Sequence, residues 1–190
     1  MNYPKGAVIR MLQQLFCQYG HRDYIGEPVS QLSHAVQTAT LAKQKFGDAN
    51  HAMVSAALLH DIGQLVGMKY AHMPKSSFGV MGHEVVGHNF LKQCNFSPVV
   101  CEMVRDHVIA KRYLSTIEPT YMSILSPASR ATLLEQNGLL DAAQMAMVRR
   151  NPFFRQSLEL RRLDDAAKKL VDCDFSELDQ FWNSVYKTLL

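Results

Sequence analysis

The stretch AALLHDIGQLVG, residues 56–67, begins with four apolar residues and then sets His60 beside Asp61. A hydrophobic core has no use for two adjacent ionisable side chains, because burying a charge without a partner is costly. A bound metal ion would satisfy both side chains, since imidazole and carboxylate groups are common metal ligands. The stretch therefore raises the hypothesis of a metal site inside the protein.

Helical periodicity extends on both sides of this stretch. Residues 5–19 carry an amphipathic pattern, and Ser30 opens a second pattern with apolar residues at helical spacing. Residues 50–61 are apolar nearly all round, which predicts a helix buried in the middle of the domain. We expect Gly63 and Gly67 to end that helix.

The second half of the chain continues the helical pattern. Residues 68–81 contain proline, serine and glycine and predict a loop, and a helix is expected over about 83–94. A Ser-Pro or Asn-Pro start signal opens further helices at 97–98, 126–127 and 151–152. Because no clear period-2 strand is present, the sequence predicts an all-α fold of seven or eight helices in one domain spanning 1–190.

The bulk composition excludes several classes of protein. Of the 190 residues, 47% are hydrophobic and 19% charged, which is typical of a soluble globular protein. The net charge of +3, without a basic run, argues against nucleic acid as a partner, and no apolar stretch has membrane-spanning length. The four cysteines form no CxxC pair and no signal peptide is evident, so we expect reduced thiols in a cytoplasmic protein.

Six side chains make up the candidate set of metal ligands. They are His34, His60, Asp61, His83, His107 and Asp164. Apart from the adjacent pair, their spacing suits one ligand per helix, and such donors suit iron, manganese, zinc or cobalt. Six ligands exceed the need of one tetrahedral site, so two metals sharing Asp61 is the economical arrangement. The remaining histidines are expected to be ordinary core or surface residues.

Two cationic side chains accompany the candidate ligands. Lys111 follows His107 by one turn on the apolar face of the expected helix. A buried lysine would be explained by an anionic substrate near the metals, and the alternative is an ammonium that reaches solvent past a buried stem. Arg161 and Asp164 are also one turn apart and could serve an anion and a metal. The alternative there is a surface ion pair.

The order of these residues resembles the HD-domain superfamily in its six-ligand, dinuclear form. The chain looks most like the mixed-valent diiron oxygenases of that superfamily, of the organophosphonate (PhnZ) type. The matching stretches cover most of the chain and are DYIGEPVSQLSHAVQ, AALLHDIG, GHEVVG, HVIAKRYL, LSPASRATL and LRRLDDAAK. The resemblance implies an HD-domain helical bundle, two iron ions in the Fe(II)/Fe(III) state, and O2 as co-substrate.

The resemblance also implies which residues hold each iron. One iron would be held by two histidines and two carboxylates, which here are His34, His60, Asp61 and Asp164. The other iron would be held by His83 and His107 and would share Asp61. His60 and Asp61 would thereby stand at the catalytic centre. Asp165 competes with Asp164, and only the family register RLD favours Asp164.

The substrate-binding residues carry over in the same way. Lys111, Ser129 and Arg161 match positions that surround the phosphonate in this family. Tyr24 and Glu27 match a loop pair in which the tyrosine can occupy an iron site until substrate arrives and the glutamate recognises the substrate amine.

Gln64 departs from the family pattern, which often has a phosphonate-contacting histidine at this position. Glutamine can still donate a hydrogen bond but cannot carry a proton. The departure bears on which phosphonate the chain accepts.

The resemblance implies oxidative cleavage of the carbon–phosphorus bond of a small 1-hydroxyphosphonate, giving a carboxylate and inorganic phosphate. 2-Amino-1-hydroxyethylphosphonate would yield glycine, and its trimethylammonio analogue would yield glycine betaine. The expected partner is this small molecule, with no nucleic acid and no membrane, and the chain is expected to be a monomer or weak dimer.

Two other functions remain open. An HD-domain phosphohydrolase acting on a nucleotide or small phosphoester would use the same six ligands with a metal-bound hydroxide. A regulatory metal-binding module without turnover is the third interpretation, which the two cations Lys111 and Arg161 disfavour.

Overall fold

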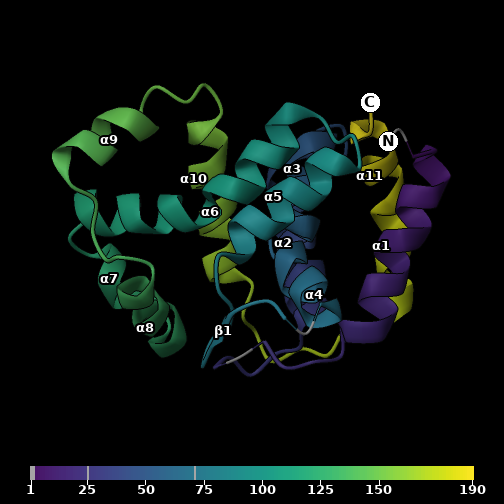
Figure 1. Ribbon diagram of the computed structural model, residues 1–190, viewed down its shortest axis with the longest axis horizontal. Coiled ribbons are helices and arrows are strands. Elements are labelled where there is room, and N and C mark those ends of the chain that lie inside the picture. Colours follow the sequence, from purple (N-terminus) through teal and green to yellow (C-terminus); the bar gives the residue numbers. More distant parts are fainter. Residues whose placement is uncertain (1–2, 25, 71) are drawn as a thin grey trace.

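The computed structural model describes residues 3–24, 26–70 and 72–190. Within those ranges the chain forms α-helices joined by loops, one 3-10 helix and one two-stranded hairpin (Figure 1). The α-helices are α1 Lys5–Tyr19, α2 Gln31–Phe46, α3 His51–Leu59, α4 Ile62–Lys69, α5 His83–Gln93, α6 Pro98–Ile117, α7 Tyr121–Ile124, α8 Pro127–Glu135, α9 Ala142–Val148, α10 Phe154–Ala166 and α11 Trp182–Thr188. The hairpin pairs β1 Lys75–Ser76 with β2 Gly79–Val80, and the 3-10 helix η1 covers Phe175–Gln180.

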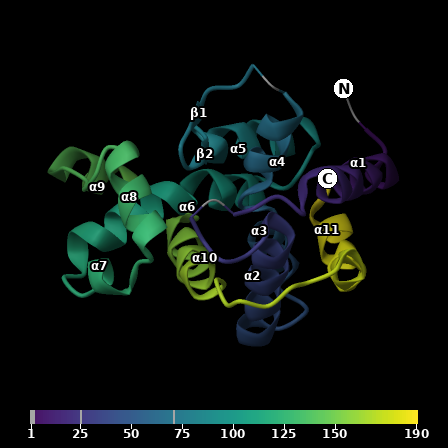
Figure 2. The same cartoon turned by 90° about the horizontal axis from the view of Figure 1, so that it is seen from below.

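The long helix α6 connects two parts of the molecule. In Figure 1 it runs from the central helices α2, α3 and α5 toward α7, α8 and α9 at one end, and α10 crosses it. Helices α1 and α11 pack together at the opposite end (Figure 2). There Lys5 Nζ donates to the carbonyl oxygen of Leu189 at 2.6 Å. The hairpin lies beside α4 and α5, on the side seen at the top of Figure 2.

The all-α fold is confirmed, and so are several helix starts. Ser30 precedes α2, and its hydroxyl accepts a hydrogen bond from the Ser33 amide, while Ser126 caps α8 in the same way. Pro98 and Pro127 occupy first helical positions, where a missing N–H has no cost. These local signals therefore set the helix boundaries that orient the site.

The prediction that Gly63 and Gly67 end the buried helix was wrong. The helix breaks earlier, at His60 and Asp61, and both glycines lie inside α4. Their role is close packing. A Cβ on Gly63 would lie 1.9 Å from the carbonyl oxygen of His83, and one on Gly67 would lie 2.5 Å from the Val80 side chain. The glycines thus let α4 pack closely against α5 and the hairpin.

The predicted count of seven or eight helices was also too low, since the described ranges hold eleven α-helices. One reason is the break at His60 and Asp61, which divides the apolar stretch between α3 and α4. Another is that α7, α9 and α11 have at most seven residues each, too few to show a helical period. Across the residues that the structure describes, no helix has both the length and the apolar character needed to cross a membrane.

The predicted loop over 68–81 is shorter than expected, because α4 continues to Lys69 and the hairpin β1–β2 orders part of the rest. Residue 71 lies outside the described residues. The assignment of 1–190 to one domain stays a prediction.

Candidate metal centre and substrate pocket

The six predicted ligands converge from five parts of the fold. His34 lies in α2, His60 and Asp61 form the break between α3 and α4, and His83 is the first residue of α5. His107 comes from α6 and Asp164 from α10. All are buried except His83, which is partly exposed. The fold therefore brings one candidate ligand, or one adjacent pair, from each of these parts to a common centre.

Asp61 lies between two pairs of histidines. Its Oδ2 is 3.4 Å from His60 Nε2 and 3.9 Å from His34 Nε2. Its Oδ1 is 3.1 Å from His83 Nε2 and 3.5 Å from His107 Nε2. Each carboxylate oxygen thus faces one histidine pair. This is the geometry that a carboxylate bridging two metal ions requires.

Asp164 lies beside the first histidine pair, His34 and His60. Its Oδ1 lies 3.2 Å from His34 Nε2 and 3.9 Å from His60 Nε2. The neighbouring Asp165 points elsewhere, to the guanidinium of Arg161 and the hydroxyl of Tyr121. The geometry therefore favours Asp164 over Asp165 as the sixth ligand.

This difference between two adjacent carboxylates gives a direct prediction. Asp164→Asn is expected to weaken metal binding at the His34 and His60 side by about 10-fold or more, because the amide presents a neutral oxygen. Asp165→Asn, the matched control, should retain the metal content of the unmodified protein. Metal analysis after dialysis measures both, and equal metal loss in the two variants would contradict the assignment.

Backbone carbonyls orient three of the four histidines. Their Nδ1 atoms lie 2.7 to 2.9 Å from carbonyl oxygens, His34 to Ala167, His60 to Ala57 and His107 to Val104. In the neutral imidazole, donation from Nδ1 leaves Nε2 as the free acceptor, directed at the cluster. Metal-bound histidines commonly have their other ring nitrogen held in this way.

The chemistry of the cluster fits a pair of metal ions. Asp61 Oδ1 and Asp164 Oδ1 are buried and have no hydrogen-bond partner among the described residues. Burial alone would lower the pKa of His60, but the Asp61 carboxylate raises it to about 9. Burial likewise opposes ionisation of Asp61, yet His60 and His83 hold its pKa well below the usual range. Bound cations would satisfy these carboxylates in place of protonated imidazoles, and the His/Asp donors suit iron.

Tyr24 covers the His34 side of the cluster. Its ring stacks on the His34 imidazole with centroids 4.1 Å apart and an interplanar angle of 22°. Burial, and next the negative charges of Asp61 and Asp164, raise the pKa of Tyr24 well above its usual value. The phenol therefore stays protonated beside the carboxylates.

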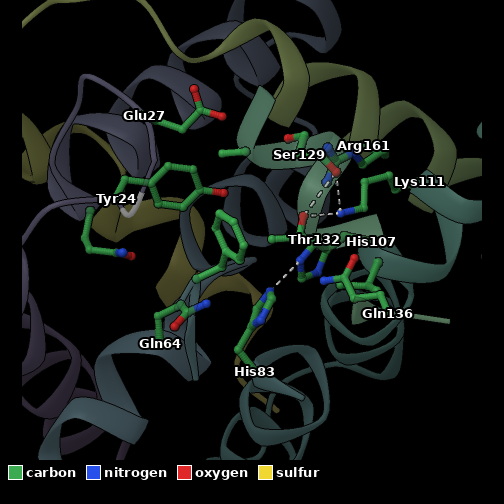
Figure 3. Close-up of a pocket in the computed structure, with 14 residues that line it drawn as sticks. Tyr24, Glu27, Gln64, His83, His107, Lys111, Ser129, Thr132, Gln136 and Arg161 are labelled. Atoms are coloured by element: carbon green, nitrogen blue, oxygen red, sulfur yellow. Dashed lines mark hydrogen bonds between the residues drawn. The ribbon is translucent and has the colours of Figure 1, made fainter. Parts of the chain in front are cut away.

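A cavity of about 60 Å³ opens beside the second histidine pair, His83 and His107 (Figure 3). All six residues predicted to bind substrate line it, namely Tyr24, Glu27, Gln64, Lys111, Ser129 and Arg161. In Figure 3, Tyr24 and Glu27 lie at one side and Lys111 at the other, with His83 below. The pocket thus joins the candidate metal centre to a set of polar and charged side chains.

Lys111 is buried with only 2% of its surface exposed, so its ammonium does not reach solvent. It donates to Thr132 Oγ1 at 2.8 Å and to the carbonyl oxygen of Ser129 at 3.3 Å. Burial, and next the charge of Arg161, lower its pKa to about 7. An anion in the pocket would stabilise the charged form.

Arg161 and Asp164 form a buried ion pair, with Nη1 2.7 Å from Asp164 Oδ2, so the interpretation as a surface pair was wrong. Arg161 also donates to Asp165, and its Nε lies 3.2 Å from the Tyr121 hydroxyl. Two carboxylates therefore hold the guanidinium in place at the pocket wall and offset its charge.

Gln64 ties the hairpin to the pocket wall. Its Oε1 accepts a hydrogen bond from the Val80 amide at 2.8 Å. This bond occupies the acceptor and leaves the Nε2 hydrogens available to an anion in the pocket. Phe78, from the same hairpin, also lines the cavity. The glutamine can thus donate to a ligand while it holds the hairpin.

Glu27 is already paired. Its Oε1 accepts from the Ser126 hydroxyl and lies 3.3 Å from Lys168 Nζ. Lys168 in turn donates to Ser129 Oγ at 2.7 Å. The sequence analysis did not single out Lys168. Its spacing of four residues from Asp164 was the available signal, but the contact with Glu27 depends on the tertiary fold.

The sequence analysis did not assign six other lining residues to the pocket: Gln31, Phe78, Val108, Ala128, Thr132 and Gln136. Thr132 follows Ser129 by one helical turn, which is a usable signal, whereas Phe78 reaches the pocket only through the hairpin. The four histidines outside the candidate set, His21, His51, His72 and His88, lie outside both of the His/Asp clusters found among the described residues.

Comparison with known proteins gives one family match and several similar proteins. The model of the HD domain matches residues 31–166. A protein of Acanthamoeba polyphaga mimivirus, named as uncharacterized, is 36% identical over 181 residues, which cover 95% of this chain and 81% of that protein.

Two of the similar proteins have named activities. The glycine-betaine-forming 1-hydroxy-2-(trimethylamino)ethylphosphonate dioxygenase of Leisingera caerulea is 36% identical over 87% of this chain and 82% of its own. The hydroxymethylphosphonate dioxygenase of Gimesia maris is 37% identical over 86% of this chain and 79% of its own. The two names agree on phosphonate oxygenation and differ in the substrate.

Proposed function

We propose, because this chain belongs to the HD-domain family and its named relatives are phosphonate dioxygenases, that it cleaves the carbon–phosphorus bond of a small 1-hydroxyphosphonate with O2. The observation that carries the proposal is the pocket itself. It joins the His/Asp cluster to a buried lysine, so an anion and a metal centre would meet in one cavity.

The reaction balances with O2 as the only oxidant. The dianion R–CH(OH)–PO3 and one O2 give R–COO⁻, hydrogen phosphate and one proton. The carbon–phosphorus bond and the C–H bond of the hydroxyl-bearing carbon break, and the atoms of O2 enter the products. Two iron ions, held by His34, His60, Asp61 and Asp164 on one side and by Asp61, His83 and His107 on the other, would supply the redox chemistry that O2 requires.

The remaining roles fall to the chain's own residues. Lys111 places an ammonium against the phosphonate, and Gln64 and Arg161 add N–H donors. Ser129 and Thr132 hold the Lys111 ammonium in position through its two hydrogen bonds. Tyr24 covers the His34 side, and Phe78 lies on the hairpin wall, so both limit the access of water.

The experiment that tests the proposal follows phosphate release and O2 uptake together. The reduced, iron-loaded protein is incubated with O2 and hydroxymethylphosphonate or 2-amino-1-hydroxyethylphosphonate. We expect one phosphate released for each O2 consumed. Release of phosphate from a phosphoester in the absence of O2 would instead identify a phosphohydrolase.

The lowered pKa of Lys111 predicts that phosphonate binding takes up a proton at this residue. A dianion beside Lys111 raises its pKa above about 7. The lysine contribution to affinity is therefore greatest below about pH 7 and is lost as the pH rises through the raised pKa.

Anaerobic calorimetric titration with hydroxymethylphosphonate at pH 8, in two buffers of different ionisation enthalpy, measures this uptake. The unmodified protein should take up close to one proton more than Lys111→Met does. Equal proton uptake in the two proteins would show that Lys111 does not meet the phosphonate.

A further inference from the structure

We propose that Lys168 makes this pocket select a phosphonate whose tail carries no positive charge. This inference rests on the proposed function and deepens it by naming the substrate class. It assigns a specificity-determining role to a lysine that lies just beyond the end of α10.

The groups suited to an organic ammonium are a carboxylate and an aromatic face, here Glu27 and Tyr24. In the structure the ammonium of Lys168 already lies against both groups. Its Nζ lies 3.3 Å from Glu27 Oε1 and 5.9 Å from the centroid of the Tyr24 ring. The side chains of Lys168 and Glu27 are 10% and 7% exposed, so the pair is shielded from water. The ammonium-binding groups of the pocket therefore hold an internal cation.

Lys168 is held in this position by its neighbours. Its ammonium donates to Ser129 Oγ at 2.7 Å, and the Ser126 hydroxyl donates to the same Glu27 oxygen that Lys168 contacts. The preceding residue, Ala167, offers its carbonyl oxygen to His34 Nδ1 at 2.9 Å, which anchors the backbone next to the metal cluster. The lysine is thus part of a built network and not a loose surface side chain.

This placement acts against a cationic substrate tail in two ways. A tail ammonium would have to displace Lys168 from Glu27, or share the space with a like charge in a poorly solvated pocket. An uncharged tail, or only hydrogen as in hydroxymethylphosphonate, meets neither obstacle. One named relative is a dioxygenase of a phosphonate with a trimethylamino tail, and the other is a hydroxymethylphosphonate dioxygenase. Their identities to this chain, 36% and 37%, are too similar to favour either substrate.

The test compares two phosphonates on the iron-loaded protein with O2. We expect kcat/KM for hydroxymethylphosphonate to exceed that for 2-amino-1-hydroxyethylphosphonate by at least about 10-fold, because like charges repel strongly where water is scarce. Lys168→Met, which keeps the length of the stem but removes the charge, should shift this ratio by at least about 10-fold toward the amine, mainly through KM. Lys168→Arg keeps the charge and should keep the preference.

Dissociation constants measured without O2 provide a second readout, with Lys168→Gln as a further neutral variant if Lys168→Met folds poorly. A preference of the unmodified protein for the amine would overturn the inference, as would an unchanged ratio in the neutral variants. Absence of O2-dependent phosphate release from either phosphonate would defeat the proposed function instead. The two dissociation constants would then still decide whether Lys168 discriminates against the amine.

Discussion

Asp61→Ala is expected to abolish binding of the two-metal centre and to lower the rate of phosphonate oxidation by more than about 100-fold, since even outer-shell changes at metal sites cost 10- to 100-fold. The reason is the position of Asp61 between the two histidine pairs. Oδ2 faces His60 and His34, and Oδ1 faces His83 and His107. Alanine removes an anionic ligand from both metal positions at once and leaves each pair of imidazoles without a shared charge.

Iron analysis of the purified variant, combined with phosphate release, measures this effect. Asp106→Asn is a suitable control, because Asp106 is also a buried carboxylate but bonds Arg105 and Asn151 away from the cluster. The control should keep the iron content of the unmodified protein. Two irons per chain in Asp61→Ala would refute the bridging role.

Gly63→Ala should destabilise the protein by about 3 kcal/mol, at the upper end of the range for overpacking. The added Cβ would lie 1.9 Å from the His83 carbonyl oxygen and 2.8 Å from the Gly87 amide nitrogen. Both contacts are with backbone, so no side-chain rotation can relieve them and α5 must move away from α4. Because His83 begins α5, the movement should also weaken metal binding at the His83 and His107 pair.

Urea unfolding of the metal-free protein reports the stability change, and iron analysis reports the second effect. Gly6→Ala is the matched control, because a Cβ on Gly6 would meet only Arg10 Nη1 at an ordinary 3.6 Å. In the helix α1 that change should stabilise by up to about 1 kcal/mol. A Gly63→Ala variant as stable as the control would contradict the close approach of α4 and α5.

Much of the helical framework could be predicted from local patterns in the sequence. The amphipathic stretch at 5–19 coincides with α1, and the caps at Ser30 and Ser126 begin α2 and α8. The failure at Gly63 has a physical cause. A glycine is visible in sequence, but its partner is a carbonyl of α5 some twenty residues away, and only the packed fold shows that glycine is there for contact and not to end a helix.

The candidate site divides in a similar way. His34, His60 and His107 could be identified from the sequence because each falls on or beside a predicted helix. The family register selected Asp164 over Asp165. The role of Lys168 could not be predicted from the sequence, because it depends on contact with Glu27, which is more than one hundred residues away. Long-range charge pairing leaves no periodic pattern in the sequence. The sequence therefore did not identify the lysine that we propose selects against a positively charged substrate tail.

The convergence of the six candidate ligands on one centre has a mechanical consequence. The ligands come from α2, the α3–α4 break, α5, α6 and α10, so a filled centre would act as a cross-link that closes several long chain loops at once. Because the metal ions would bind the assembled helices and not the unfolded chain, their binding would stabilise the folded state. The resistance of the protein to unfolding would then depend on iron supply, and the same ions that serve the reaction would hold the molecule together.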